Sequence, residues 1–291
     1  MHPAPSVIVF TTLSGLGFGF LAFLGLGAVP VSGLAAFLLY GLAYGFAVAG
    51  LLASTFHLGN PQRAWRAFTQ WRTSWLSREA WTSVATLLLM APAALAAIFA
   101  GFTPATFGLP GALLALVTVF CTSMIYAQLK TVPRWNQWVT PALFLTFALT
   151  GGAMLSGRSL IAVLLCILLA VLLVVSFRRG DKALAESGTT METATGLGGI
   201  GKVRLYEPPH TNSNYLMREM IHVVGRKHSQ KLRAIAVLFA AVLPGLILLT
   251  LPHSLAAVAL AVALHLMGAF AARWLFFAEA EHVVGLYYGA R

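Results

Sequence analysis

The sequence predicts an all-α integral membrane protein with eight transmembrane helices, and three observations lead to this fold class. Of the 291 residues, 59% are hydrophobic and 9% are charged, whereas a soluble domain is roughly 45–50% apolar. The mean hydropathy is +0.83, and the apolar residues gather in runs that approach the ~20 residues needed to cross a bilayer core. The charged residues lie mainly between these runs. Because backbone groups in lipid must be satisfied within the segment, the runs are helices rather than strands.

Eight runs define the predicted spans. They cover residues 6–27, 33–56, 79–100, 107–129, 138–155, 159–177, 232–252 and 254–278. The fifth and sixth runs are short, and a single re-entrant unit is the alternative interpretation of this pair. Residues 1–291 thus form one membrane domain with two larger extramembrane parts. These parts are an insert at 57–78, between helices 2 and 3, and a loop with a basic helix at 178–231.

The positive charges predict the orientation. With eight helices both termini lie on one side, and the loops of that side, 57–78, 130–137 and 178–231, carry four, two and nine Lys/Arg residues. By the positive-inside rule, the termini and these loops are cytoplasmic in a bacterial inner membrane. A cationic surface that docks an acidic partner would show the same pattern. Orientation and lipid explain the net charge of +11, so no nucleic-acid partner is expected.

The insert itself predicts an interfacial amphipathic helix. Asn60 and Pro61 have the residue types of an N-cap and a first helical position. An aromatic stripe at helical spacing then faces the acyl boundary, formed by Ala64, Trp65, Phe68, Trp71 and Trp75. Ser77 is the expected N-cap of the third span, which places Glu79 in its first turn. A second amphipathic helix, basic and cytoplasmic, is expected from Asn214 to Arg233, on the membrane surface or against a partner.

His57 and Glu79 flank the insert and are the strongest candidates for chemistry. Two-electron quinone chemistry moves two protons, so each ring oxygen needs a hydrogen-bonding group that relays protons to water. A histidine and a carboxylate at the membrane edge suit that task. The alternative is electrostatic, because an imidazolium at a helix C-terminus and a carboxylate at an N-terminus are each stabilised by ~0.3–1 kcal/mol without any function.

Other residues around the insert complete the candidate quinone site: Arg63, Arg66, Trp71, Arg72 and Arg78. For the arginines, contacts to lipid headgroups are the alternative. No metal site is expected in this chain. Cys121 and Cys166 lie inside apolar runs, and two thiolates are too few for an iron–sulfur cluster. His265 is in the middle of a span, where we expect a buried, hydrogen-bonded histidine.

Two stretches resemble the DMSO reductase anchor subunit family: HLGNPQRAW…LSRE, from His57 to Glu79, and EMIHVVGRKHSQKLR, from Glu219 to Arg233. The resemblance extends over essentially the whole chain. It implies a haem-free, quinone-reactive membrane subunit, with ubiquinone or menaquinone as the quinone. It also implies two partners, a four-cluster iron–sulfur subunit and a bis-molybdopterin catalytic subunit. In that family a histidine and a glutamate at the positions of His57 and Glu79 are implicated in quinol binding.

Docking of the partners is expected on the insert and on basic-helix residues: Arg218, Glu219, Arg226, Lys227, His228 and Lys231. The family has two branches, anchors of menaquinol-oxidising DMSO reductases and anchors of quinone-reducing sulfite dehydrogenases. The segments MHPAPSVIVFTT and YEPPHTNSNYLMREM look more like the second branch. The favoured expectation is therefore sulfite oxidation with quinone reduction. A haem b anchor and a transporter are the other classes considered. The first needs paired histidines, and the second commonly shows internal repeats.

Overall fold

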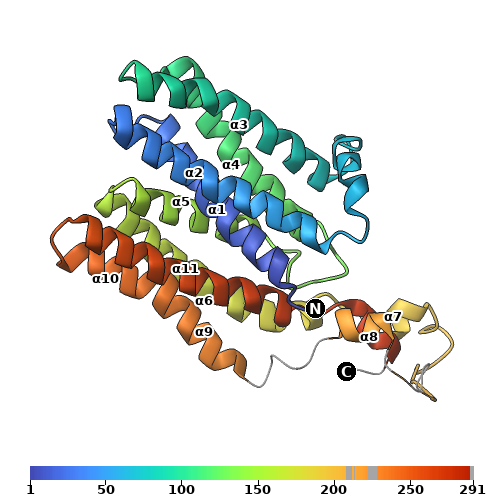
Figure 1. The fold of residues 1–291 in the computed structure, drawn as a ribbon. Coiled ribbons are helices and arrows are strands. Elements are labelled where there is room, and N and C mark those ends of the chain that lie inside the picture. The colour runs from blue at the N-terminus through green and yellow to red at the C-terminus, as the bar shows by residue number, and fades with distance from the viewer. Residues whose placement is uncertain (208–211, 213, 222–227, 289–291) are drawn as a thin grey trace.

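The computed structural model describes residues 1–207, 212, 214–221 and 228–288, and all regular secondary structure in these residues is helical. Within these described residues, seven helices are long and apolar enough to cross a membrane (Figure 1). They are α1 (Pro5–Gly25), α2 (Gly33–Ala53), α3 (Trp75–Phe99), α4 (Ala105–Ala127), α6 (Ser159–Glu186), the continuous run from Ser229 to Thr250, and α11 (Leu255–Ala278).

The remaining predicted span is α5 (Val139–Leu155), an apolar helix of 17 residues. At 1.5 Å per residue it is about 26 Å long, slightly less than a hydrocarbon core. Helix α6 is long enough to cross by itself and continues nine residues past the predicted end at 177, to Glu186. The two helices pack against each other as separate elements, so the re-entrant alternative is not supported.

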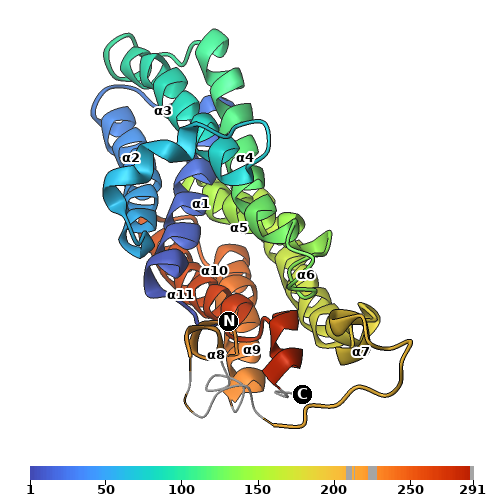
Figure 2. The same cartoon turned by 90° about the vertical axis from the view of Figure 1, so that its right-hand side faces the viewer.

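Helix α1 lies at the centre of the bundle, with α2, α4, α5 and α11 packed around it (Figures 1 and 2). Its glycines allow close approach of neighbouring backbones. A Cβ at Gly19 would lie 3.0 Å from the Cα of Ala148 in α5. A Cβ at Gly17 would lie 2.7 Å from the Cα of Ala47 in α2. Small residues permit this packing between apolar helices in lipid.

The insert folds differently from the predicted amphipathic helix. The backbone forms a 3₁₀ turn, η1 (Ser54–His57), and then the 3₁₀ helix η2 (Pro61–Phe68). The helical pattern ends at Phe68, whose carbonyl accepts a hydrogen bond from the Trp81 indole at 2.9 Å. The predicted stripe is therefore broken, with Trp71 in the following turn and Trp75 at the start of α3.

The N-cap of α3 is Ser74 rather than Ser77. The Ser74 hydroxyl accepts a hydrogen bond from the Ser77 N–H at 3.4 Å. The helix therefore begins at Trp75, and Glu79 lies in its second turn instead of its first. A carboxylate one turn inside the helix gains little from the macrodipole. The helix macrodipole therefore does not explain why a carboxylate is placed at position 79.

The predicted basic helix from Asn214 to Arg233 is also interrupted. Asn214 caps a short helix, α8 (Tyr215–Glu219), by accepting from the Met217 N–H at 2.9 Å. Met220 and Ile221 are not helical. Helix α9 (Ser229–Val237) then begins three residues before the predicted seventh span and continues through the π-helix η4 (Leu238–Val242) into α10 (Leu243–Thr250).

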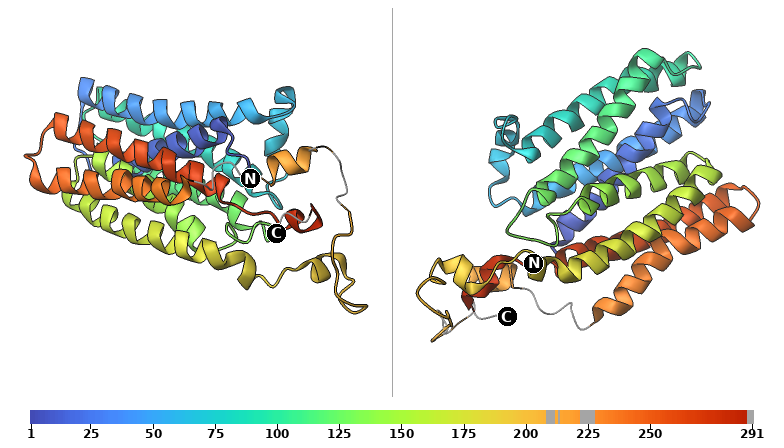
Figure 3. Two further views of the ribbon diagram at one scale, coloured as in Figure 1. Left: turned by 90° about the horizontal axis from the view of Figure 1, so that it is seen from below. Right: turned by 180° about the vertical axis from the view of Figure 1, so that it is seen from behind.

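The N-terminus and the 3₁₀ helix η5 (Val283–Tyr288) lie at one end of the bundle, together with the insert, α7 (Met191–Thr195) and α8 (Figures 1 and 3). We call this end the terminal face. The N-terminal amine donates to the Ala280 carbonyl at 2.8 Å. The Val283 N–H donates to the Thr131 carbonyl at 3.0 Å. These bonds tie the start of the chain and the loop after α4 to the residues that follow α11.

Candidate functional site

The insert and the start of α3 line an aromatic cavity of about 460 Å³ that is open to the surface. Its lining residues are Phe68, Trp71, Arg78, Trp81 and Thr82. The Phe68 and Trp81 rings meet edge to face, with centroids 5.4 Å apart. Because the Trp81 indole also holds the Phe68 carbonyl, the end of η2 is fixed to α3. The volume and the aromatic walls suit a flat organic ring.

Arg78 holds the turn that borders this cavity. Its guanidinium donates to the carbonyls of Trp71, at 3.0 Å, and Arg72, at 2.7 Å. The same group lies 4.3 Å from the Trp75 ring centroid, a cation–π distance. Arg63 and Arg66 line a separate cavity of about 350 Å³. The side chain of Arg72 lines neither cavity and lies near the Trp71 ring, 5.6 Å from its centroid.

Glu79 is buried, with 4% of its surface exposed, at the contact between α3 and α4. Its carboxylate accepts a hydrogen bond from the Thr122 hydroxyl of α4. That hydroxyl also lies 3.0 Å from the Thr118 carbonyl. The Thr118 hydroxyl is in turn 3.3 Å from the Thr86 hydroxyl. A ladder of threonine hydroxyls thus runs from Glu79 along the α3–α4 contact.

The predicted site residues fall into three groups. Trp71 and Arg78 share the aromatic cavity, Arg63 and Arg66 share the second cavity, and Arg72 and Glu79 line neither. The side chain of His57 lies outside the described part of the structure, so its pairing with Glu79 stays a prediction.

Sequence reasoning missed Trp81 and Thr122. The signal for Thr122 is the i, i+4 pair of threonines, 118 and 122, inside an apolar run.

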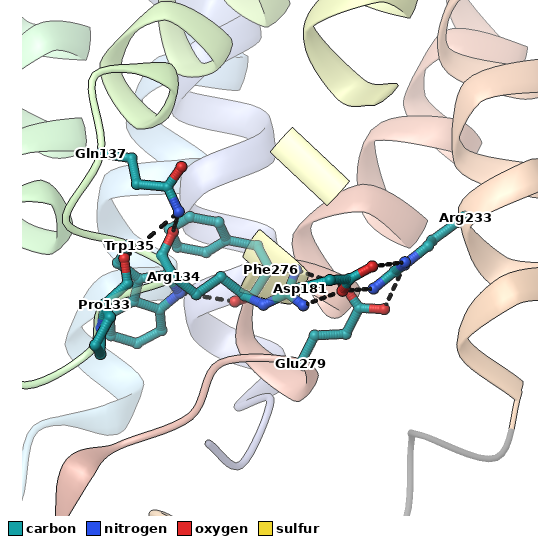
Figure 4. A network of polar contacts seen from close by, with 8 residues as sticks. All are labelled: Pro133, Arg134, Trp135, Gln137, Asp181, Arg233, Phe276 and Glu279. Carbon is teal, nitrogen blue, oxygen red and sulfur yellow. Dashed lines mark hydrogen bonds and ion pairs between the residues drawn. The ribbon is translucent and has the colours of Figure 1, made fainter. Parts of the chain in front are cut away.

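An ionic cluster of four residues closes the terminal face between helices (Figure 4). Arg134 contacts Asp181 at 2.6 Å and Glu279 at 3.1 Å. Arg233 contacts Asp181 at 2.6 Å and Glu279 at 2.7 Å. The four charges cancel, and Glu279 is 6% exposed whereas Asp181 is 46% exposed. Because each arginine bridges both carboxylates, the loop after α4 is joined to α6, α9 and the end of α11.

Gly180 and Trp135 lie beside the ionic cluster and help to hold Arg134 and the loop after α4 in place. Gly180 leaves room for the Arg134 side chain, since a Cβ there would lie 2.7 Å from Arg134 Cζ. The Trp135 indole donates to the Phe276 carbonyl at 2.8 Å and stacks on the Phe276 ring at 5.2 Å (Figure 4). Except for their charge, nothing in the local sequence marks these residues as partners.

The predicted docking residues lie on the terminal face where the structure describes them. Arg218 is exposed in α8, and Glu219 is half-buried with its carbonyl accepting from the His2 N–H at 2.7 Å. His228 and Lys231 are exposed at the start of α9. The other two predicted residues, Arg226 and Lys227, lie outside the described residues.

His265 and His282, outside the insert, have defined hydrogen-bond partners. His265 of α11 is buried, and its Nδ1 donates to the Ala240 carbonyl at 2.7 Å. Pro244 has no N–H for that carbonyl four residues earlier, so the histidine supplies a donor. His282 accepts from the Val284 N–H at 3.0 Å through Nδ1. Burial, and then the nearby N-terminal amine, lower the pKa of His282. Across the described residues, no group of three His, Cys, Asp or Glu side chains is arranged to hold a metal.

Comparison with known proteins agrees with this architecture. The family described as DMSO reductase anchor subunit (DmsC) matches residues 6–289. A relative from Allochromatium vinosum, named as the C subunit of sulfite dehydrogenase, is 30% identical over 341 residues, which cover 99% of this chain and 99% of the relative. No solved structure matches the chain. The chain is therefore a multi-pass membrane protein that belongs to the DmsC family of oxidoreductase anchor subunits.

Proposed function

We propose that this subunit exchanges electrons between the quinone pool and an iron–sulfur partner, and that quinone reacts beside Glu79. Anchors of the DmsC family bind menaquinone. The proposal concerns the ring chemistry that menaquinone and ubiquinone share. Eight spans, with α5 as the short one, carry the site in the bacterial inner membrane. The partners are a four-cluster iron–sulfur subunit and a molybdopterin catalytic subunit.

The buried carboxyl of Glu79 is the observation that carries this proposal. It lies 4% exposed within a helix pair, with a neutral hydroxyl as its hydrogen-bond partner. No arginine of the described chain pairs with it. A buried acidic group without an arginine partner is costly in an apolar environment and usually has a function there. Proton exchange with a reacting ring is a task that such a group can perform.

Thr122 supports the transfer of a proton through Glu79. A hydroxyl has one proton, yet Thr122 has two acceptors, the Glu79 carboxylate and the Thr118 carbonyl. Both contacts are hydrogen bonds together only when Glu79 is protonated and donates to the Thr122 oxygen. Loss of that proton turns the Thr122 hydroxyl toward the carboxylate. Thr122 is thus a positioning residue that stabilises both protonation states of Glu79.

The aromatic cavity next to the insert supplies the walls for the ring. Arg78 offers a donor and the Thr82 hydroxyl an acceptor at its edge, and Trp71 and Trp81 offer flat apolar faces. Thr82 lies one turn from Glu79 and donates to its backbone carbonyl at 3.2 Å. We place the ring in this cavity, with His57, at the start of the insert, as the second proton-exchanging group.

Sulfite oxidation with quinone reduction is the favoured direction of electron flow. The relative from Allochromatium vinosum has the name of a sulfite dehydrogenase subunit. The terminal face holds the insert and the basic segments, which suits a cytoplasmic catalytic partner under the positive-inside rule. The menaquinol-oxidising anchor of a DMSO reductase is the second candidate, favoured by the description of the family.

The site is tested in the intact complex with His57→Ala and Glu79→Gln. Each variant should assemble and keep activity with an artificial dye at the catalytic subunit, because the dye bypasses quinone. Quinone-linked turnover should fall by about 10²-fold, the lower range for loss of a general acid–base group. Glu186→Gln, at an exposed position at the end of α6, is the matched control. Unchanged quinone-linked turnover in both test variants would contradict the assignment of His57 and Glu79 to the quinone site.

The direction is tested by isolating the subunit gently with its partners. The eluate is assayed with sulfite plus a quinone analogue, and separately with reduced quinol plus DMSO. Sulfite-dependent quinone reduction supports the favoured direction. Quinol oxidation by DMSO keeps the anchor function and supports the second candidate. Recovery of no iron–sulfur partner from intact membranes would contradict the anchor function itself.

A further inference from the structure

Three cavities follow one another from the terminal face toward the middle of the bundle, away from the insert and Glu79. The outer cavity, about 190 Å³, lies at the ionic cluster. The middle cavity, about 30 Å³, shares Arg134 and Glu279 with the outer one. The inner cavity, about 10 Å³, shares Phe147 and Arg273 with the middle one. A bound water needs roughly 10–15 Å³, so the inner two cavities are of the size of single waters.

Arg273, on α11, stands between the two inner cavities and is 4% exposed. Its guanidinium carbon lies 3.5 Å from the Phe144 ring centroid and 5.1 Å from that of Phe147. Within the part of the chain that the structure describes, Arg273 has no carboxylate partner and no hydrogen bond. A guanidinium has five N–H donors, and the two rings satisfy only its faces. A buried cation in this state requires further partners.

Unpartnered polar atoms lie at both ends of the same path. Thr12 of α1 lines the inner cavity, and its buried hydroxyl has no hydrogen-bond partner. Arg134 lines the outer and middle cavities, and its buried Nε has no partner either. Buried polar groups are nearly always hydrogen-bonded, to ordered water when protein atoms are lacking. His265, near the middle of α11, also lines the inner cavity, which marks the depth that the path reaches.

We propose that these cavities form a water-filled inlet from the terminal face to mid-membrane, ending at a water site held by Arg273 and Thr12. Water bound there hydrates the guanidinium and supplies the missing partner of the Thr12 hydroxyl. The positive charge of Arg273 repels cations along the same path. The inlet is separate from the quinone site, because its walls come from α1, α5, α6, α9, α11 and the loop after α4 rather than from the insert and α3.

The test is X-ray hydroxyl-radical footprinting of the intact complex in lipid nanodiscs. Radicals formed from bound water modify the side chains beside it. Phe147, which lines both inner cavities and is 7% exposed, is the reporter. Phe23 is equally buried, at 7%, and lines none of the three cavities. Modification of Phe147 should be several-fold faster than that of Phe23, and equal rates would overturn the inlet.

Two matched variants test the inner water site. Thr12→Val removes the unpartnered hydroxyl and should reduce the modification of Phe147 several-fold. Thr150→Val removes a buried hydroxyl that donates to its own helix, to Thr146 at 2.6 Å, and should leave the modification unchanged. General loosening of the bundle would affect both variants alike. Modification that is insensitive to Thr12→Val, or equally sensitive to both substitutions, would overturn the Thr12–Arg273 site.

Discussion

Gly180 and Arg134 occupy complementary space: the missing side chain of the glycine is where the guanidinium lies. A Cβ at Gly180 would be 2.7 Å from Arg134 Cζ, which is far closer than van der Waals contact. The position of the cation depends on this glycine, and so do the ion pairs of Arg134 with Asp181 and Glu279. Helix α6 therefore supports the cluster in two ways: Asp181 supplies a carboxylate, and Gly180 leaves the space that the Arg134 guanidinium occupies.

Gly180→Ala should displace Arg134 and weaken the ionic cluster. Forcing a methyl group into filled space typically costs about 1–3 kcal/mol. The expected result is a lower unfolding temperature of the purified subunit or complex in detergent. Gly45→Ala is the matched control, because a Cβ there meets nothing within 4 Å, and it should not lower the unfolding temperature. Equal effects of the two substitutions would contradict the role of Gly180.

Glu279→Gln should destabilise the terminal face more strongly than Gly180→Ala does. Glu279 is 6% exposed and faces both Arg134 and Arg233, so its neutralisation leaves two arginines with a single carboxylate. Removing one partner of a buried ion pair costs ~3–5 kcal/mol, and the exposed Asp181 should keep the loss near the lower value. Chemical denaturation measures the difference. Glu186→Gln, in an exposed position on the same face, should change little.

Thr122→Val should slow quinone-linked turnover by about tenfold, because a hydrogen bond to a charged group contributes about 1.5–3 kcal/mol. Activity with an artificial dye should be unaffected. Thr122→Ser keeps the hydroxyl and should restore most of the rate. The pH profile of quinone-linked turnover should shift in the valine variant only. A valine variant with the wild-type rate and profile would show that Thr122 does not act on Glu79.

The lowered pKa of His282 predicts that the folded protein is less stable in mild acid than at neutral pH. The pKa of His282 is lowered in the folded protein, so near pH 6 the unfolded chain binds a proton that the folded chain does not. The stabilising contribution of the neutral ring is therefore present above the ordinary histidine pKa of ~6.5 and is lost as the pH falls below it. Protonation also removes the Nδ1 acceptor of the Val284 N–H.

The measurement is the unfolding temperature at pH 7.5 and pH 5.5, for the wild type and for His282→Asn. The asparagine oxygen can accept the same hydrogen bond at both pH values. The variant should therefore lose less stability between them than the wild type. His253→Asn, at the opposite end of the bundle, serves as control and should behave like the wild type. An unchanged pH dependence in His282→Asn would contradict the assignment.

The spans could be predicted because hydrophobic runs of this length have one stable arrangement in lipid. Seven predicted runs correspond to long apolar helices and the eighth to the short α5. Their ends were less predictable, as α6 shows, because polar residues continue a helix beyond the membrane without changing its pattern. The 3₁₀ form of η2 and the Ser74 cap depend on bonds to Trp81 and Ser77. Hydropathy does not encode these contacts.

The candidate site was only partly predictable, because contacts between residues far apart in the sequence are also not encoded by hydropathy. Glu79 was identified because an acidic residue beside an apolar run is unusual. Thr122 was not, since a threonine in a membrane helix normally bonds to its own backbone. The ionic cluster joins residues 134, 181, 233 and 279. Their pairing follows from how the helices pack, which no spacing within the sequence reveals.

The π-helix η4 accommodates one extra residue between the two halves of one span. A π turn contains one residue more than an α turn, so each of its residues advances the helix by less than the ~100° of an α-helical residue. On the early side of η4, Arg233 faces Glu279. On the late side, Gly245 faces Cys166 of α6. Deleting a single residue from 238–242 would restore a regular α-helix and leave both halves close to their present rotation, because the extra residue is absorbed within one turn. A one-residue deletion there would thus be less disruptive than the same deletion elsewhere in the span, since both halves could keep their neighbours.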